Sequence, residues 1–170
     1  YYGLREKLFG IKNFGIWDEE LIKDVGANAK MNEFQAAMGL CNLRHIDREL
    51  AKRKAVVEHY NERLSGVNGL KISAPQKDVN PNYAYYPVIF EPEEFGKRRD
   101  EIYELLKVNE IYARKYFYPL TNTFECYKGM FDMGDTPVAL DLSKKVLTLP
   151  LYADLRIDQV DRICDIIRGR

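Results

Sequence analysis

Apolar residues recur at helical spacing from Asn32 to Leu64. They are Phe34, Ala37, Met38, Cys41, Ile46, Leu50, Val57, Tyr60 and Leu64, and no proline interrupts them. The pattern predicts one long helix, which Gly66 and Gly69 would end. Given the rise per residue of an α-helix, it would be roughly 50 Å long. Because one small domain does not cover that length, we expect this helix to bridge two domains.

Strand and helix patterns alternate in the rest of the chain. Strand character is found in four stretches, 70–72, 83–90, 111–114 and 146–149. Helical spacing is found in three others, 4–14, 96–108 and 158–167. Pro137 is typical of the first turn of a further helix. The pattern predicts an α/β fold, more narrowly an α+β small domain in which helices cover a mostly antiparallel sheet.

The strands at 70–72 and 83–90 are close in sequence and are expected to pair as neighbours. Pro87 lies inside the second strand and has no backbone N–H to donate. It therefore favours an edge position or a bulge. The tyrosines of this strand, Tyr83, Tyr85 and Tyr86, are interpreted as core residues.

The composition is that of a soluble globular protein of about one domain. Of the 170 residues, 46% are hydrophobic and 31% charged, and 26 basic residues balance 26 acidic ones. No overall field therefore attracts nucleic acid or an anionic membrane. The basic run at 97–99 is followed by Asp100 and Glu101, so we interpret it as a solvated helix face. The sequence shows neither a membrane span nor a signal-peptide pattern, and the expected location is cytoplasmic.

The cysteines and histidines carry no recognisable site. Three widely separated cysteines, Cys41, Cys126 and Cys164, fit reduced thiols better than a disulfide framework. His45 and His59 lie on the predicted long helix without a metal-ligand pattern, so a structural or surface role is expected for both.

A polar loop precedes the long helix. Gly26 permits backbone conformations closed to other residues, and the amide of Asn28 can donate and accept hydrogen bonds. Asn32 and Gln35 have the spacing of an N-cap pair. An ordinary loop with a helix cap explains these residues, and so does a ligand site.

A second candidate region is the aromatic and basic segment 112–119. Its rings could stack on a base or pack on a sugar, and Arg114 could bind a diphosphate. An aromatic core strand with a basic edge is the alternative. Tyr127 and Lys128 fall in a neighbouring loop and are weaker candidates.

Several short motifs together resemble the DegT/DnrJ/EryC1/StrS sugar aminotransferase family of pyridoxal-phosphate enzymes. They are Asn13-Phe-Gly-Ile16, Gly26-Ala-Asn-Ala-Lys-Met31, Gln35-Ala-Ala37, Tyr118-Pro-Leu120, Pro137-Val-Ala139 and Leu147-Thr-Leu-Pro-Leu-Tyr152. Their order and spacing match that family nearly from end to end. The resemblance implies the C-terminal portion of an enzyme of the aspartate aminotransferase fold, fold type I.

This resemblance also implies what the chain lacks. In the family, a large N-terminal domain carries the lysine that holds pyridoxal 5'-phosphate as a Schiff base. We therefore expect residues 1–31 to be a remnant of the large domain and residues 32–170 to hold the long helix and the small domain. The segment alone is expected to be inactive, with no catalytic residue and no metal ligand in it.

The family's binding residues map onto five positions. Asn28 matches the residue that reaches across a homodimer to the cofactor phosphate in the partner subunit. Lys30 stands where the family usually has arginine and is expected to contact a phosphate or carboxylate without arginine's bidentate geometry. Arg114, Tyr116 and Tyr118 are implied to line the sugar-nucleotide pocket.

The resemblance implies a complete enzyme that transfers an amino group from glutamate to a nucleotide-linked keto sugar, for surface polysaccharide or natural-product synthesis. A deoxythymidine-linked 4-keto-6-deoxyhexose is the substrate we expect. Two alternatives stay open: a sugar dehydratase of the same family, in which histidine replaces the lysine, and a stand-alone binding domain without catalysis.

Overall fold

The computed structural model describes residues 2–18, 21–74, 76–116 and 118–169. The chain divides into two compact units, Tyr1–Ile46 and Asp47–Arg170. The predicted end of a large-domain remnant at residue 31 stays a prediction, because compactness within this chain does not test the domain boundary of a longer enzyme.

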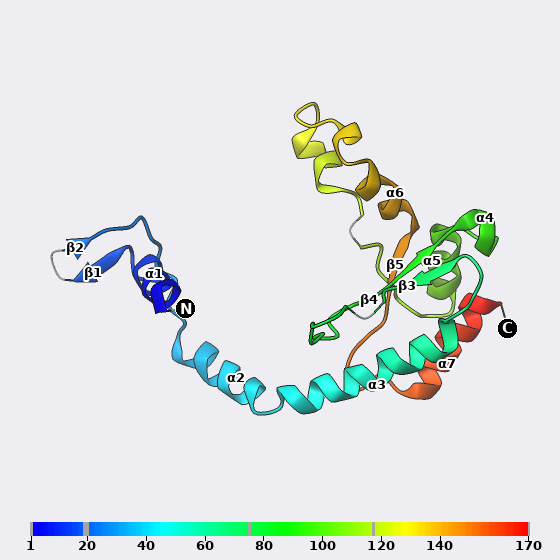
Figure 1. The fold of residues 1–170 in the computed structure, drawn as a ribbon, viewed down its shortest axis with the longest axis horizontal. Coiled ribbons are helices and arrows are strands. Elements are labelled where there is room, and N and C mark those ends of the chain that lie inside the picture. Colours follow the sequence, from blue (N-terminus) through cyan, green and yellow to red (C-terminus); the bar gives the residue numbers. More distant parts are fainter. Residues whose placement is uncertain (1, 19–20, 75, 117, 170) are drawn as a thin grey trace. The chain divides into compact units, whose positions relative to one another are not determined.

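The first unit is small and has little buried surface. Helix α1 (Tyr2–Lys12) leads into a two-stranded antiparallel sheet of β1 (Ile16–Asp18) and β2 (Leu21–Ile22), and α2 (Glu33–Leu43) follows a polar loop (Figure 1). None of the side chains of α2 is buried. The cap predicted for this helix is confirmed: the Gln35 N–H donates to Asn32 Oδ1 at 2.9 Å, and the Asn32 N–H donates to Gln35 Oε1 at 3.0 Å.

The prediction of one uninterrupted helix from residue 32 to 64 was wrong. Helix α2 ends at Leu43, and α3 (Ile46–Leu64) begins after a turn. In that turn the N–H of Arg44 donates to the Cys41 carbonyl and the N–H of His45 donates to the Asn42 carbonyl. Each N–H thus bonds the carbonyl three residues earlier, in place of the α-helical partner four residues earlier. His45 therefore lies outside both helices.

The second unit is an α+β domain, as the sequence predicts. Its further elements are β3 (Leu70–Ile72), β4 (Tyr86–Phe90), α4 (Pro92–Phe95), α5 (Arg99–Val108), three short 3₁₀ helices η1 (Thr121–Thr123), η2 (Glu125–Tyr127) and η3 (Met133–Asp135), α6 (Pro137–Lys145), β5 (Val146–Leu149) and α7 (Ile157–Arg168). Pro137 opens α6 and Gly169 ends α7 in a left-handed conformation, as expected of these residue types.

The three strands form one antiparallel sheet in the order β3-β4-β5. Leu70 pairs with Phe90, and Val88 pairs with both Ile72 and Leu147, so the predicted pairing of the first two strands is confirmed. The predicted strand at 111–114 is reduced to a single bridge between Arg114 and Thr148.

Pro87 lies in the central strand, whose pairings with β3 and β5 show no register shift, so the prediction of an edge position or a bulge was wrong. Its partner Thr148 exchanges both of its backbone hydrogen bonds with Arg114 on the opposite side. Pro87 and Thr148 are therefore a pair without hydrogen bonds between them, and the backbone nitrogen and carbonyl of Pro87 point toward the β3 side. Because β3 ends at Ile72, opposite Val88, no acceptor there requires the N–H that proline lacks.

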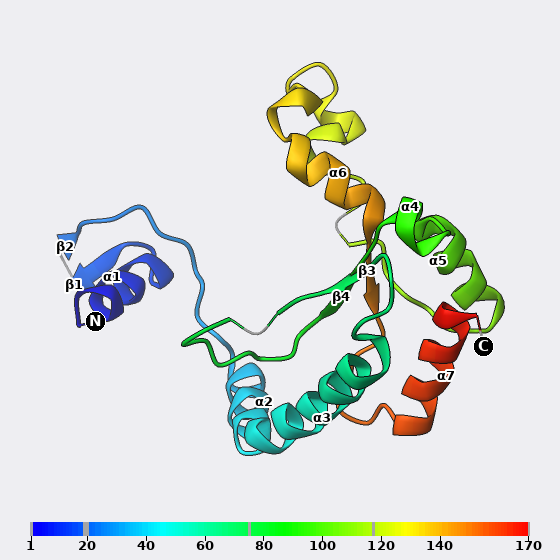
Figure 2. The ribbon, with the colours of Figure 1, turned by 45° about the vertical axis from the view of Figure 1, so that its right-hand side comes forward.

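One core joins this sheet to three helices (Figure 2). Alternate residues of β4 point to the same face, and its buried residues are Tyr86, Val88 and Phe90. Helices α3, α5 and α7 cover that face with a set of buried residues, Val56, Tyr60, Leu64, Ile102, Leu106, Val160, Ile163, Cys164 and Ile167. The hydroxyl of Tyr60 donates to the carbonyl of Pro150 at 3.0 Å, so its burial leaves no unpaired polar group. Burial raises the pKa of the Cys164 thiol to about 12, which keeps it protonated.

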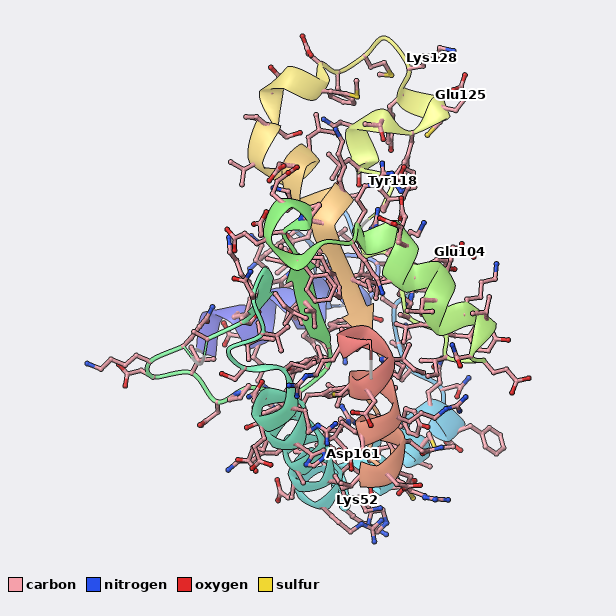
Figure 3. All side chains as sticks on the ribbon, turned by 90° about the vertical axis from the view of Figure 1, so that its right-hand side faces the viewer. Lys52, Glu104, Tyr118, Glu125, Lys128 and Asp161 are labelled. Carbon is pink, nitrogen blue, oxygen red and sulfur yellow. The ribbon has the colours of Figure 1, made fainter. Side chains whose placement is uncertain are left out.

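Polar contacts fix α7 beside α3. Asp161 Oδ1 lies 2.8 Å from His59 Nε2 and 3.0 Å from Arg63 Nη1, and Arg63 also pairs with Asp165. Lys52 of α3 contacts Asp154 just before α7 at 2.7 Å, and Figure 3 labels both Lys52 and Asp161. His59 thus has the structural role expected for it.

No helix in the described part of the chain combines the length and apolar character that a bilayer crossing requires. Among those same residues, no three His, Cys, Asp or Glu side chains are placed to hold a metal ion.

Replacement of Leu147 tests the core. Its side chain is fully buried on β5, so Leu147→Ala is expected to lower the free energy of unfolding by about 2–5 kcal/mol, through lost burial and a residual cavity. Val108→Ala is the control, since Val108 is 75% exposed and the expected change is within about 0.5 kcal/mol. Urea denaturation measures both variants, and equal destabilisation would contradict the assigned core.

Candidate functional site

The loop before α2 is fixed against the end of α1 by backbone hydrogen bonds. The N–H of Ala27 donates to the Ile11 carbonyl at 3.0 Å, and the N–H of Ala29 donates to the Lys12 carbonyl at 2.9 Å. A Cβ on Gly26 would lie 2.3 Å from the Ile11 carbonyl oxygen. Gly26 is therefore required because a side chain would not fit between two backbone segments that approach closely. The sequence had suggested a different reason, the conformational freedom of glycine.

Asn28 and Lys30 both lie exposed on this loop. The backbone of Asn28 bridges to Asn13, while its side-chain amide has no hydrogen-bond partner among the described residues. Lys30 Nζ donates to Asn13 Oδ1 at 2.9 Å and lies 4.9 Å from the centroid of the Phe14 ring. The loop therefore presents an amide donor and, beside it, a cation held without a carboxylate partner in the described chain.

Arg114 is positioned by the sheet of the second unit. Its N–H donates to the Thr148 carbonyl at 2.9 Å and its carbonyl accepts from the Thr148 N–H at 2.8 Å. Residues directly opposite in antiparallel strands share a face, so the side chains of Arg114, Thr148 and Pro87 point to the face opposite the helical core. Arg114 is exposed, and no ion pair engages it among the described residues.

Two tyrosines extend this site. The guanidinium carbon of Arg114 lies 5.5 Å from the Tyr116 ring centroid, and the Tyr116 ring stacks on Tyr85 at 4.8 Å. The Tyr116 hydroxyl donates to the Tyr85 hydroxyl at 3.1 Å, and this hydrogen bond raises the pKa of Tyr116. The other ring predicted for this site, Tyr118, is half exposed, and Phe117 lies outside the described residues.

A cleft of about 500 Å³ adjoins the tyrosine pair. It opens between α3 and the segment leading into β4, and its lining includes Asn61, Tyr83 and Tyr85. The prediction that Tyr85 belongs to the core was therefore wrong, because its side chain is 52% exposed. The prediction is confirmed for Tyr86, which is 5% exposed and donates its hydroxyl to Asn61 Oδ1 at 2.8 Å.

Two residues near Arg114 were not identified from the sequence as candidate site residues. Arg99, assigned there to a solvated face, is 1% exposed, and its guanidinium carbon lies 5.0 Å from the Tyr118 ring centroid. Thr148 Oγ1 is buried without a hydrogen-bond partner among the described residues. A charge run and a strand threonine are common on solvated surfaces, so no local signal marked either residue.

Tyr127 and Lys128 lie apart from this arrangement. The Tyr127 ring stacks on Phe124 and meets the Phe131 ring edge to face, and Lys128 pairs with Glu125 at 3.2 Å. Figure 3 shows Lys128 and Glu125 on the projecting 3₁₀-helical segment, with Tyr118 between that segment and α5.

Comparisons with known proteins lead to one aminotransferase family. The profile of the DegT/DnrJ/EryC1/StrS aminotransferase family matches residues 3–168. A dTDP-4-amino-4,6-dideoxy-D-glucose transaminase from Escherichia coli is 40% identical over 162 residues, which are 94% of this chain and 43% of that protein. A transaminase of the same name from Shigella dysenteriae is 36% identical over 97% of this chain and 45% of its own length. The chain thus spans less than half the length of these curated relatives.

A solved structure gives the same result. The crystal structure of DesI in the presence of its TDP-sugar product superimposes with a TM-score of 0.85 at 27% identity, covering 99% of this chain and 43% of that one. The expected fold, the C-terminal portion of a fold-type I aminotransferase, is thereby confirmed.

Replacement of Gly26 tests the loop geometry. Gly26→Ala places a methyl group against the Ile11 carbonyl, so the Ala27 and Ala29 amides are expected to exchange with solvent at least about fivefold faster as their hydrogen bonds loosen. Gly39→Ala is the control, since nothing lies within 4 Å of its added Cβ. Hydrogen exchange measures both, and unchanged exchange at Ala27 and Ala29 would contradict this role of Gly26.

Proposed function

Because the chain belongs to the DegT/DnrJ/EryC1/StrS aminotransferase family, we propose that it is part of an enzyme that transfers an amino group from glutamate to a nucleotide-linked keto sugar. The family match over residues 3–168 carries this proposal. Two relatives at 40% and 36% identity share the name dTDP-4-amino-4,6-dideoxy-D-glucose transaminase, which favours dTDP-4-dehydro-6-deoxyglucose as the keto substrate.

Pyridoxal phosphate is the cofactor that this family implies, and the loop residues fit its phosphate. The amide of Asn28, which has no hydrogen-bond partner among the residues that the structure describes, suits a phosphate oxygen whose charge other groups already balance, and Lys30 supplies a cation nearby. When bound, the cofactor acts as an electron sink at the carbon that exchanges the amino group. In this proposal Asn28 binds the cofactor of the partner subunit in a homodimer, and the lysine of the Schiff base lies outside this chain.

Arg114 is the residue that we propose binds the diphosphate. Its guanidinium is exposed and has no ion-pair partner in the described residues, whereas neighbouring Lys115 pairs with Asp100 at 2.7 Å. A guanidinium can donate two parallel hydrogen bonds to phosphate oxygens. Tyr116, stacked on Tyr85, would then give the sugar or base an aromatic surface, with Tyr118 next to it.

The central test is the reaction of the full-length enzyme. With pyridoxal phosphate, glutamate and dTDP-4-dehydro-6-deoxyglucose, mass spectrometry is expected to detect a dTDP-amino sugar, with 2-oxoglutarate formed in equal amount. A product formed by loss of water without an amino group would indicate the dehydratase instead.

Arg114→Ala in that enzyme separates substrate binding from amino-donor binding. The loss of a charge-assisted hydrogen bond, worth about 1.5–3 kcal/mol, is expected to raise the KM for the nucleotide sugar by roughly 10- to 100-fold. The KM for glutamate should stay within about twofold. Arg98→Ala serves as the control because its side chain is 80% exposed and pairs only with Glu101 in the described chain. Equal effects on both substrates would refute the assignment.

Asn28→Ala tests whether the Asn28 amide binds the cofactor phosphate. Because one neutral hydrogen bond of about 1 kcal/mol is lost, the Kd for pyridoxal phosphate should rise roughly fivefold. The unfolding midpoint of the apoprotein should not change, since the side chain has no partner within the described residues. Fluorescence titration of the apoenzyme gives the Kd, and an unchanged value would leave Asn28 as a loop residue.

A further inference from the structure

Arg99 is a buried cation in an unfavourable position. It is the first residue of α5 and is only 1% exposed. The positive end of the helix dipole disfavours a cation there, and removal of a guanidinium from water is costly unless it is well paired. Because both effects act against a cation at this position, the contacts of Arg99 with other segments must offset them.

The contacts of Arg99 join α5 to β5 and to the segment that carries Arg114 and Tyr116. Arg99 Nη1 donates to the Val146 carbonyl at 3.0 Å, at the start of β5. Arg99 Nε donates to Asp100 Oδ1 at 2.7 Å, and its guanidinium carbon lies 5.0 Å from the Tyr118 ring centroid. One side chain therefore contacts both β5 and the residue that ends the 114–118 segment.

Asp100 extends the same network to Lys115. Its Oδ1 accepts from Arg99 and lies 2.7 Å from Lys115 Nζ, which itself sits 4.5 Å from the centroid of the Tyr103 ring. Partial burial acts to raise the pKa of Asp100, but its hydrogen bonds to Lys115 and Arg99 outweigh that effect and lower it. The carboxylate is therefore charged at neutral pH and holds both cations.

The network fixes the segment at residues next to Arg114 and Tyr116. Lys115 is tied to Asp100, Tyr118 packs on Arg99, and the Arg114 backbone is paired with Thr148. Tyr116 lies between the anchors at Lys115 and Tyr118, and its ring contacts the side chain of Arg114. A shift of either anchor would move the cation and the ring that face the proposed substrate.

We propose that Arg99, acting with Asp100, is a positioning residue that holds Arg114, Lys115 and Tyr116 in the conformation that presents Arg114 and Tyr116 to the nucleotide sugar. This inference rests on the proposed function of that segment and adds a residue that does not itself touch substrate. The positions of Arg114 and Tyr116 would then be set from α5, and binding of the nucleotide sugar would depend on a buried side chain behind them.

Arg99→Lys in the full-length enzyme is the sharpest test. A lysine keeps the charge but cannot bond Asp100 and the Val146 carbonyl with one planar group. The KM for dTDP-4-dehydro-6-deoxyglucose should rise at least about fivefold, while kcat and the KM for glutamate stay within about twofold. Calorimetric titration with dTDP alone should show the same loss of affinity without turnover.

A second variant, Asp100→Asn, leaves the buried Arg99 side chain in place. The Asp100 side chain is 61% exposed, so Asp100→Asn weakens the ties to Arg99 and Lys115 at little risk to folding. In both variants the peptide 112–120 should exchange its amide hydrogens faster than in the wild type. Matched controls on the same helix region are Arg98→Lys and Glu104→Gln, whose side chains are exposed and which should change neither the KM nor the exchange. Figure 3 labels Glu104 on α5.

The outcomes separate this inference from the proposed function. An inactive wild-type enzyme with glutamate and the keto sugar would reject the proposed function itself. An active wild type whose sugar KM, dTDP affinity and peptide exchange are all unaltered by Arg99→Lys and Asp100→Asn would reject only the positioning role. Equal increases in both substrate KM values would also reject it, because they indicate general loss of structure.

Discussion

The antiparallel pairing of β5 is the interaction on which the proposed site depends. One edge of β5 pairs with β4, and its other edge, at Thr148, pairs with Arg114. Leu147 and Leu149 on the same strand are buried in the core. The hydrophobic free energy that holds these leucines therefore also fixes the backbone from which Arg114 projects. A flexible loop could not hold a guanidinium at a constant distance from its aromatic neighbours.

The two faces of this sheet have different environments. Tyr86, Val88 and Phe90 are buried under the helices, whereas Pro87, on the opposite face, is only partly buried. Thr148 shares the face of Pro87, and its buried hydroxyl lacks a partner within the described residues. Core packing on one face and polar, aromatic and cationic groups near the other are typical of a sheet that carries a binding site on a rigid support.

The sequence predicted the local elements well where a single periodicity or cap determined them. The capping box of Asn32 and Gln35, the helix opened by Pro137 and the strand pair beginning at Leu70 all have signals within a few residues. The motifs around Gly26 and Asn28 also led to the correct family. The break at Arg44 was missed because neither glycine nor proline marks it, and only the switch to shorter hydrogen bonds shows it.

The sequence by itself determined the fold class and the family, because side-chain periodicity and motif order are properties of the chain itself. It also supplied the candidate binding residues, which stay a prediction. Only the tertiary structure decided that Tyr85 is exposed beside Tyr116 and that Arg99 is buried beneath Tyr118. It also decided that Pro87 fits a central strand, because β3 ends before reaching it. These facts depend on contacts between residues far apart in sequence, which no local pattern encodes.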